Sequence, residues 1–210
     1  MSDSSKKDET ETNLQALKGA ALMKNAQKGT FGYLKAKRTI VLIRTIIYFG
    51  ISLSLFFAGI IATDTRKNLL TVVAVLGCLP ACKSLVNLIM YLKASGCSKE
   101  AKEPLRKAEG SLCCMYDMYF TSYKENFAIS HMTVAGKNIC GYTEDKKCNI
   151  NGCEDHLAAM LKQAGYKDLT IKIFTDLNKY CERLHQLNAL EHKNFDRNVE
   201  IQAALYDISL

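Results

Sequence analysis

Two apolar stretches decide the fold: residues 40–62 read IVLIRTIIYFGISLSLFFAGIIA, and residues 69–92 read LLTVVAVLGCLPACKSLVNLIMYL. A helix that crosses a bilayer needs about 20 mostly apolar residues to span roughly 30 Å of hydrocarbon. Both stretches are long enough, and only a short loop joins them. The sequence therefore predicts a two-helix transmembrane hairpin over residues 39–92.

The basic residues that flank the two stretches predict their orientation. Those before the first stretch and after the second are Lys35, Lys37, Arg38, Lys93, Lys99, Lys102, Arg106 and Lys107. The connecting loop, Thr63 to Asn68, contains only two basic residues, Arg66 and Lys67. Cytoplasmic loops carry an excess of Lys and Arg. We therefore expect a multi-pass protein of the cell membrane with both termini in the cytoplasm.

The net charge of +7 lies close to these stretches. Residues 1–38 hold eight basic and four acidic side chains, a net of +4, whereas residues 93–210 hold sixteen of each. A nucleic-acid-binding domain would be basic itself. The juxtamembrane basic residues are instead suited to anionic lipid headgroups. The sequence thus favours the lipid bilayer over nucleic acid as a partner.

Residues 1–38 form the N-terminal region. Residues 1–12 are polar and charged without apolar anchors, which is typical of a disordered tail. Residues 14–31 mix Leu, Ala and Phe with Lys, a pattern that fits a basic amphipathic helix on a membrane surface. A loosely helical linker interrupted by glycines is the alternative.

Small residues recur every four positions in both apolar stretches. They are Gly50, Ser54 and Ala58 in the first, and Ala74, Cys78 and Cys82 in the second. Such faces let helix backbones approach closely in a membrane. The two faces are expected to pack against each other in the hairpin or to drive self-association between copies.

Lys83 is a charged residue inside the second stretch. It lies near the end of the stretch, so its side chain can reach the headgroups. The alternative is an intramembrane polar site that Lys83 forms with Asn87, one helical turn away.

A cytosolic α+β domain is predicted over residues 98–210. The expected elements are a short helix before residue 109, strands over 112–121, 127–134, 138–143 and 169–173, and helices capped by Asn151 and Thr175, with a last helix over 195–206. The helix capped by Asn151 is expected to end near Gly165. Gly136 is expected to form the turn of the hairpin between the second and third strands. The predicted order is α-β-β-β-α-β-α-α.

Residues 98–174 resemble the core of restriction-endonuclease-like nucleases, in which a helix, three antiparallel strands, a helix and a further strand frame a metal site. The triplet Glu144-Asp145-Lys146 stands where that family has an acidic residue, any residue and Lys. The resemblance implies that Asp117 and Glu144 bind a divalent metal ion and that Lys146 helps to activate water. The second strand carries Ser130 and His131 where the family has a preceding acid.

The nine cysteines suggest no firm metal site. Cys140, Cys148, Cys153 and His156 are separated by seven, four and two residues, whereas zinc-binding pairs usually have two to four between them. Reduced structural cysteines are the expected alternative in the cytoplasm. The adjacent Cys113 and Cys114 would face opposite sides of a strand. No cofactor is favoured.

Two hypotheses follow from the sequence. The first is an integral membrane protein whose cytosolic α+β domain binds another protein or its own copies. The second is a membrane-anchored, metal-dependent nuclease or an inactive descendant of one. The sequence contains no GxGxxG, phosphate-loop, HExxH or GxSxG motif, so it offers no sign of the nucleotide-dependent enzymes and hydrolases that use them.

Overall fold

The computed structural model describes residues 27–63, 69–190 and 195–210. The predicted disordered tail, most of the predicted amphipathic helix, and the loop residues Arg66 and Lys67 lie outside the described residues. The chain forms two compact units. We call residues 34–94 the helix pair, and residues 27–33 together with 95–210 the sheet unit.

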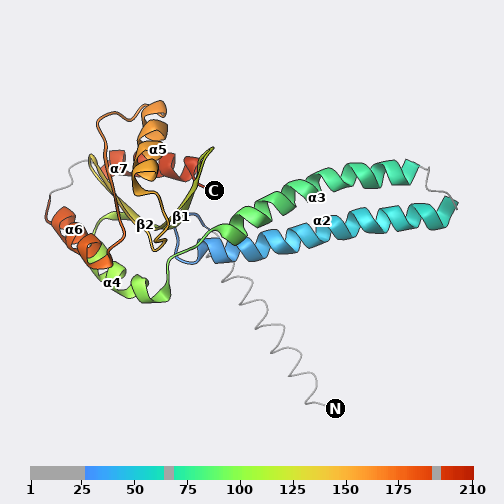
Figure 1. Cartoon of the computed structure of the whole chain (residues 1–210), viewed down its shortest axis with the longest axis horizontal. Helices are drawn as coiled ribbons and strands as arrows, with labels where there is room; N and C mark the ends of the chain where they lie inside the picture. Colours follow the sequence, from blue (N-terminus) through green and yellow to red (C-terminus); the bar gives the residue numbers. More distant parts are fainter. Residues whose placement is uncertain (1–26, 64–68, 191–194) are drawn as a thin grey trace, which may run out of the picture. The chain divides into compact units, whose positions relative to one another are not determined.

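The helix pair consists of α2 (Tyr33–Thr63) and α3 (Leu69–Lys93), which lie side by side (Figure 1). At a rise of 1.5 Å per residue these helices are about 46 and 38 Å long. Both are long and apolar enough to cross a membrane. The two predicted long apolar helices are therefore confirmed, and α2 starts seven residues before the predicted stretch.

Small and polar residues pack α2 against α3. The buried residues that follow a spacing of three and four along these helices are Val41, Thr45 and Ser52 in α2, and Ala74, Ala81, Ser84 and Tyr91 in α3. The hydroxyl groups of Thr45 and Ser84 share a hydrogen bond of 2.7 Å. A side chain at Gly77 would lie 2.8 Å from the Ser52 hydroxyl, so the backbones approach closely there.

The predicted small-residue faces do not form most of this contact. Ala74 is buried and Cys78 half-buried, but Gly50, Ser54, Ala58 and Cys82 are exposed. Four residues turn a helix by about 400°, so a strict four-residue repeat drifts around the helix. Residues that alternate spacings of three and four drift less around the helix, so they keep one face toward the neighbouring helix. Self-association through the exposed small residues remains a prediction.

The carboxyl end of α3 is capped by Arg38 of α2. The Arg38 guanidinium donates hydrogen bonds to the carbonyl oxygens of Tyr91, Leu92 and Ala94 at 3.1 to 3.4 Å. The last carbonyl groups of a helix have no partners within it and carry partial negative charge. Arg38 therefore satisfies the end of α3 in addition to contributing a basic charge.

A four-stranded mixed sheet forms the centre of the sheet unit, in the order β1-β2-β3-β4. β1 (Cys113–Thr121), β2 (Asn126–Ala135) and β3 (Asn138–Tyr142) are antiparallel neighbours, and β4 (Thr170–Phe174) runs parallel to β3. Gly136 has a φ of 62° and makes the turn between β2 and β3, as predicted.

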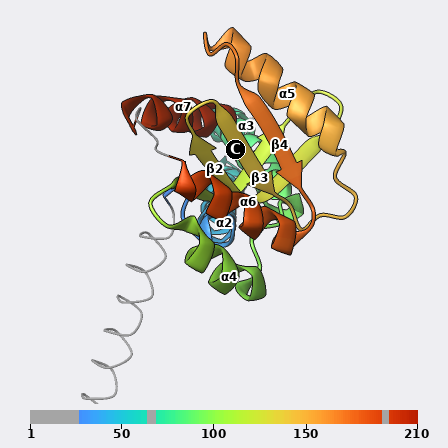
Figure 2. The same ribbon diagram turned by 90° about the vertical axis from the view of Figure 1, so that its left-hand side faces the viewer.

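Helices cover both faces of this sheet (Figures 1 and 2). α5 (Ile150–Gln163) and α7 (Phe195–Ile208) pack on one face, around Leu157. α4 (Lys99–Glu109) and α6 (Leu177–Ala189) pack on the other. The element order α-β-β-β-α-β-α-α of the predicted α+β domain is thus confirmed.

Two predicted helix caps were wrong. The cap of α5 is Asn149, whose side chain accepts a hydrogen bond of 3.0 Å from the Gly152 N–H, and Asn151 lies inside the helix. The cap of α6 is Asp176, one residue after Thr175. A capping oxygen must reach the N–H of the second or third helical residue, and these two residues are the ones placed to do so.

The segment before α2 packs against the sheet. Gly29 pairs with Tyr116 of β1, whose N–H donates to the Gly29 carbonyl at 2.8 Å. The Phe31 ring packs edge-on against Tyr116 at 5.9 Å, and the Lys102 ammonium lies 4.2 Å from the Phe31 ring centre. Residues 27–33 therefore belong structurally to the sheet unit, although the sequence placed them in the N-terminal region.

Candidate functional site

Asp117 interrupts the regular alternation of β1. It is buried and has a φ of 54°, in the left-handed region that Asp tolerates better than most residues. Met115 and Met118 lie in the same core cluster although they are three residues apart, and so do Ile129 and Met132 on β2. Residues three apart in a regular strand face opposite sides. Both strands therefore reverse their facing at the level of Asp117.

The Asp117 carboxylate holds both chain segments that lead to the helix pair. One oxygen accepts a hydrogen bond of 2.7 Å from the Gly32 N–H, just before α2. The other accepts one of 2.7 Å from the Cys97 N–H, soon after α3. A side chain at Gly96 would lie 2.8 Å from this carboxylate. The arrangement makes Asp117 a structural clamp.

Glu144 anchors the start of α4 beside this clamp. Its carboxylate accepts hydrogen bonds from the Ser98 N–H at 3.2 Å and from the Ser98 hydroxyl at 2.9 Å. The Ser98 hydroxyl also accepts from the Ala101 N–H at 3.1 Å, which makes Ser98 the N-cap of α4. A carboxylate at a helix N-terminus is stabilised by the helix dipole.

The structure brings two of the three predicted nuclease residues to adjacent backbone groups. Asp117 and Glu144 bind the N–H groups of Cys97 and Ser98, respectively, and Lys146 is exposed in the turn after Glu144. No group of three His, Cys, Asp or Glu side chains in the described ranges is arranged to hold a metal ion. Nuclease activity remains a prediction, and both carboxylates already serve as acceptors for backbone donors.

A polar network that the sequence did not predict lies between the sheet, α4 and α6. The fully buried His131 of β2 has its Nε2 at 3.2 Å from the Glu109 carboxylate and its Nδ1 at 2.7 Å from the Tyr180 hydroxyl. The Tyr116 hydroxyl also donates to Glu109. The Tyr180 hydroxyl lies 3.4 Å from the Cys140 carbonyl oxygen. The imidazole thus joins β2 to α4 and α6, and the Tyr116 and Tyr180 hydroxyl groups extend the network to β1 and β3.

The network changes the titration of its members. Burial alone would raise the pKa of Glu109, but hydrogen bonds from His131 and Tyr116, with the charges of His131 and Arg106, lower it below the ordinary value. Burial raises the pKa of Tyr116, and the hydrogen bond to Glu109 adds to this. The Glu109 carboxylate is therefore ionised at neutral pH and the Tyr116 hydroxyl keeps its proton.

A carboxylate-histidine pair can orient an imidazole for acid-base catalysis, but this pair faces tyrosines in the core. A nearby thiol, Cys114, has its pKa raised to about 12 by burial, so it is no activated nucleophile. The arrangement satisfies buried polar groups and fixes the packing of α4 and α6. In the sequence, the members of this network lie far apart on separate elements, and no motif spacing connects them. They are Glu109, Tyr116, His131 and Tyr180.

The cysteines of the alternative zinc set lie on different sides of the sheet. Cys153 belongs to the core between the sheet and α5, whereas Cys140 belongs to the core under α4 and α6. One ion cannot bind both thiols. Burial raises the pKa of Cys140, and raises that of Cys153 to about 12. All nine cysteines are free thiols.

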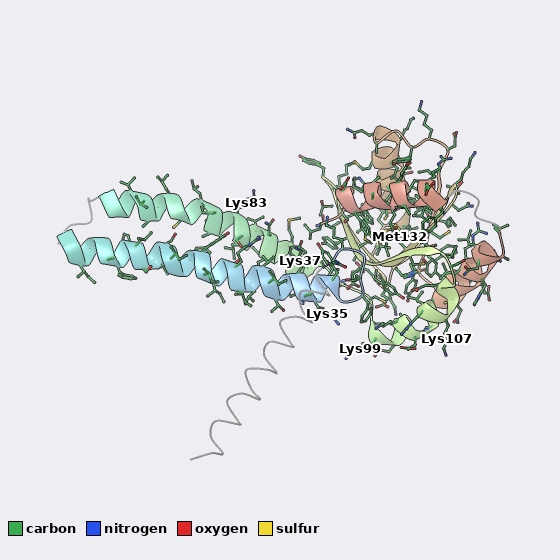
Figure 3. All side chains as sticks on the ribbon, turned by 180° about the vertical axis from the view of Figure 1, so that it is seen from behind. Lys35, Lys37, Lys83, Lys99, Lys107 and Met132 are labelled. Atoms are coloured by element: carbon green, nitrogen blue, oxygen red, sulfur yellow. The ribbon has the colours of Figure 1, made fainter. Side chains whose placement is uncertain are left out.

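The predicted intramembrane polar residues lie together on the helix pair. Lys83, labelled on α3 in Figure 3, is exposed and Asn87 is half-buried. They line one hollow together with Arg44, Tyr48, Pro80 and Ser84. The sequence identified Lys83 and Asn87 but did not join them to Arg44 of the other helix.

Comparisons with protein-family models, with curated proteins and with solved structures found no match. The functional argument therefore depends on the residues of this chain.

Replacing Asp117 with Ala is expected to destabilise the sheet unit by about 3 kcal/mol, because two backbone donors lose a charged acceptor. Asp168→Ala is the matched control, since Asp168 also has a positive φ, 60°, but is exposed. The control is expected to cost only about 1 kcal/mol for the left-handed backbone. Hydrogen exchange of the Gly32 and Cys97 amides in the full-length protein in detergent measures the loss of stability in each variant. An equal loss in the two variants would contradict the clamp.

Glu109 is expected to make stability fall in acid. Its folded-state pKa is lowered from 4.5, so the unfolded chain takes up the proton first. Its stabilising contribution is full above the ordinary pKa and is lost as the pH falls through the folded-state value. Unfolding of Glu109→Gln in detergent between pH 7 and about pH 3 should show a shallower acid dependence than the unchanged protein. Parallel curves would refute this role.

Proposed function

We propose that this chain is an integral membrane protein whose α2–α3 hairpin spans the bilayer and presents the sheet unit in the cytoplasm as an interaction domain. The observation that carries the proposal is the exposure of apolar side chains on both helices. Only 17% and 22% of their most apolar windows are buried, whereas the core helix of a water-soluble protein is mostly buried. Lipid is the natural cover for such surfaces.

The details of both helices agree with a lipid environment. Ile61 of α2 is 84% exposed and Leu79 of α3 is 67% exposed, and neither helix contains Asp or Glu. The hydroxyl groups of Thr45 and Ser84 meet each other between the helices. Hydrogen bonding of this kind is a usual means of joining helices where lipid offers no partner. The basic residues near the start of α2 and at and after the end of α3 support cytoplasmic termini.

The interaction role is supported by an apolar surface of the sheet unit. Leu190, Phe195 and Val199 expose 54%, 65% and 42% of their surface, and the first two line a hollow beside β1. Aromatic side chains such as Phe195 are enriched at protein interfaces, and exposed apolar patches mark interaction sites. We propose that a protein partner or a second copy of the chain binds this surface.

Topology is tested by labelling with an impermeant maleimide and identifying the labelled peptide by mass spectrometry. A cysteine introduced at Thr65 is expected to react in intact cells, because the loop faces outward. Cysteines at Ser5 and Tyr123 should react only after permeabilisation. Tyr123 is fully exposed, so a missing signal there cannot come from burial in the sheet unit. The opposite pattern would reverse the orientation.

The interaction surface is tested by cross-linking in cells followed by purification of the full-length protein. Phe195→Ser is expected to abolish the main cross-linked species or weaken it at least tenfold, since central aromatic anchors carry much of the binding energy. Tyr123→Ser is the control, because it also removes an exposed aromatic ring. A chain that remains monomeric without cross-links, or equal loss in both variants, would count against this role.

A further inference from the structure

A hollow on the helix pair gathers two cations from different helices. Arg44 and Tyr48 of α2 face it from one side, and Lys83, Ser84 and Asn87 of α3 from the other. No Asp or Glu occurs anywhere in α2 or α3 to neutralise these cations. The hollow therefore presents two positive charges and several neutral hydrogen-bonding groups to one small volume.

The packing of the two helices fixes this arrangement. Thr45 and Ser84, the sequence neighbours of Arg44 and Lys83, share the 2.7 Å hydrogen bond. The two cations are consequently held at the same level along the pair. Because Thr45 and Ser84 are both buried, a shift along the helix axes would break a hydrogen bond that no water replaces.

The level of the hollow matches the edge of the hydrocarbon. From Thr45 to the end of α2 at Thr63, the helix rises about 27 Å, and from the start of α3 at Leu69 to Ser84 it rises about 23 Å. A bilayer has a hydrocarbon core of about 30 Å. With the α2–α3 loop at one surface, Arg44 and Lys83 therefore lie just inside the other edge of the hydrocarbon, and their long side chains reach the headgroups of that leaflet.

We infer that this hollow binds the phosphate of an anionic phospholipid, an inference that rests on the proposed membrane-spanning hairpin. The Arg44 guanidinium offers paired donors that fit phosphate oxygens, and Lys83 supplies a second charge. The Tyr48 hydroxyl and the Asn87 amide add neutral donors. The hollow lies toward the start of α2 and the end of α3, which the proposed topology puts at the cytoplasmic surface, so the ligand belongs to the cytoplasmic leaflet.

The surroundings of the hollow favour a lipid over free phosphate. Ile51 lies one turn beyond Tyr48 on α2, and Leu76 lies two turns before Lys83 on α3. Both are on the side of the hollow toward the membrane centre, and they expose 54% and 59% of their surface. A phospholipid would place its phosphate on the cations and its acyl chains along these apolar residues.

Native mass spectrometry of the full-length protein in detergent tests the site. Phosphatidylglycerol is titrated against the unchanged protein, against Arg44→Gln/Lys83→Gln, and against Lys35→Gln/Lys93→Gln, which also removes one exposed cation from each helix. The hollow variant is expected to bind phosphatidylglycerol about 30-fold more weakly, and the control variant much less so. Arg44→Lys/Lys83→Arg should keep most of the binding.

Three outcomes would overturn the inference. Equal phosphatidylglycerol binding by all variants would remove the site, and displacement of the lipid by inorganic phosphate would make the ligand free phosphate. Binding of phosphatidylcholine as strong as that of phosphatidylglycerol would remove the anionic preference. If the double variant fails to insert, Arg44→Gln and Lys83→Gln singly, each expected to weaken binding about fivefold, decide the question.

Extraction of membranes at alkaline pH separates this inference from the proposed function. A chain that stays in the membrane but has unchanged lipid binding in the hollow variant contradicts the lipid site alone. A chain that washes off contradicts the membrane-spanning hairpin and the lipid site with it.

Discussion

The structure depends on the Asp117 carboxylate and its two backbone donors. Gly32 and Cys97 lie 65 residues apart in the chain, on the segments that enter and leave the helix pair, and each donates a hydrogen bond of 2.7 Å to this one side chain. Hydrogen bonds to a charged group are stronger than neutral ones, and a buried site keeps water from competing. The sheet unit thus closes both segments onto β1 at a single residue.

The position of Asp117 in β1 has a second consequence. Its left-handed backbone reverses the facing of the strand, so that Tyr116 points to the α4 and α6 side while Met115 and Met118 point to the other. The neighbouring strand reverses in step, and His131 meets Tyr116 there at a ring distance of 4.6 Å. The clamp and the network around the half-buried Glu109 therefore depend on the same irregularity.

The predictions that the structure confirmed were based on regular sequence patterns. The long apolar stretches and the Gly136 turn each show a run length or a residue type that local structure requires. Asp117 shows why the candidate site was harder to predict from the sequence than the fold. Strict alternation gives it no reason to adopt a positive φ, and its donors come from segments distant in sequence. A local pattern can therefore place Asp117 on a strand without revealing its partners.

The resemblance to a nuclease core illustrates the same limit. Element order and the Glu144 triplet are local features, and the structure has both the order and the carboxylates in neighbouring places. What an acidic residue does depends on the donors around it. Here Ser98 donates twice to Glu144, and the resulting cap fixes the first turn of α4. Two carboxylates that resemble metal ligands in sequence thus act as hydrogen-bond acceptors for the backbone at Gly32, Cys97 and Ser98.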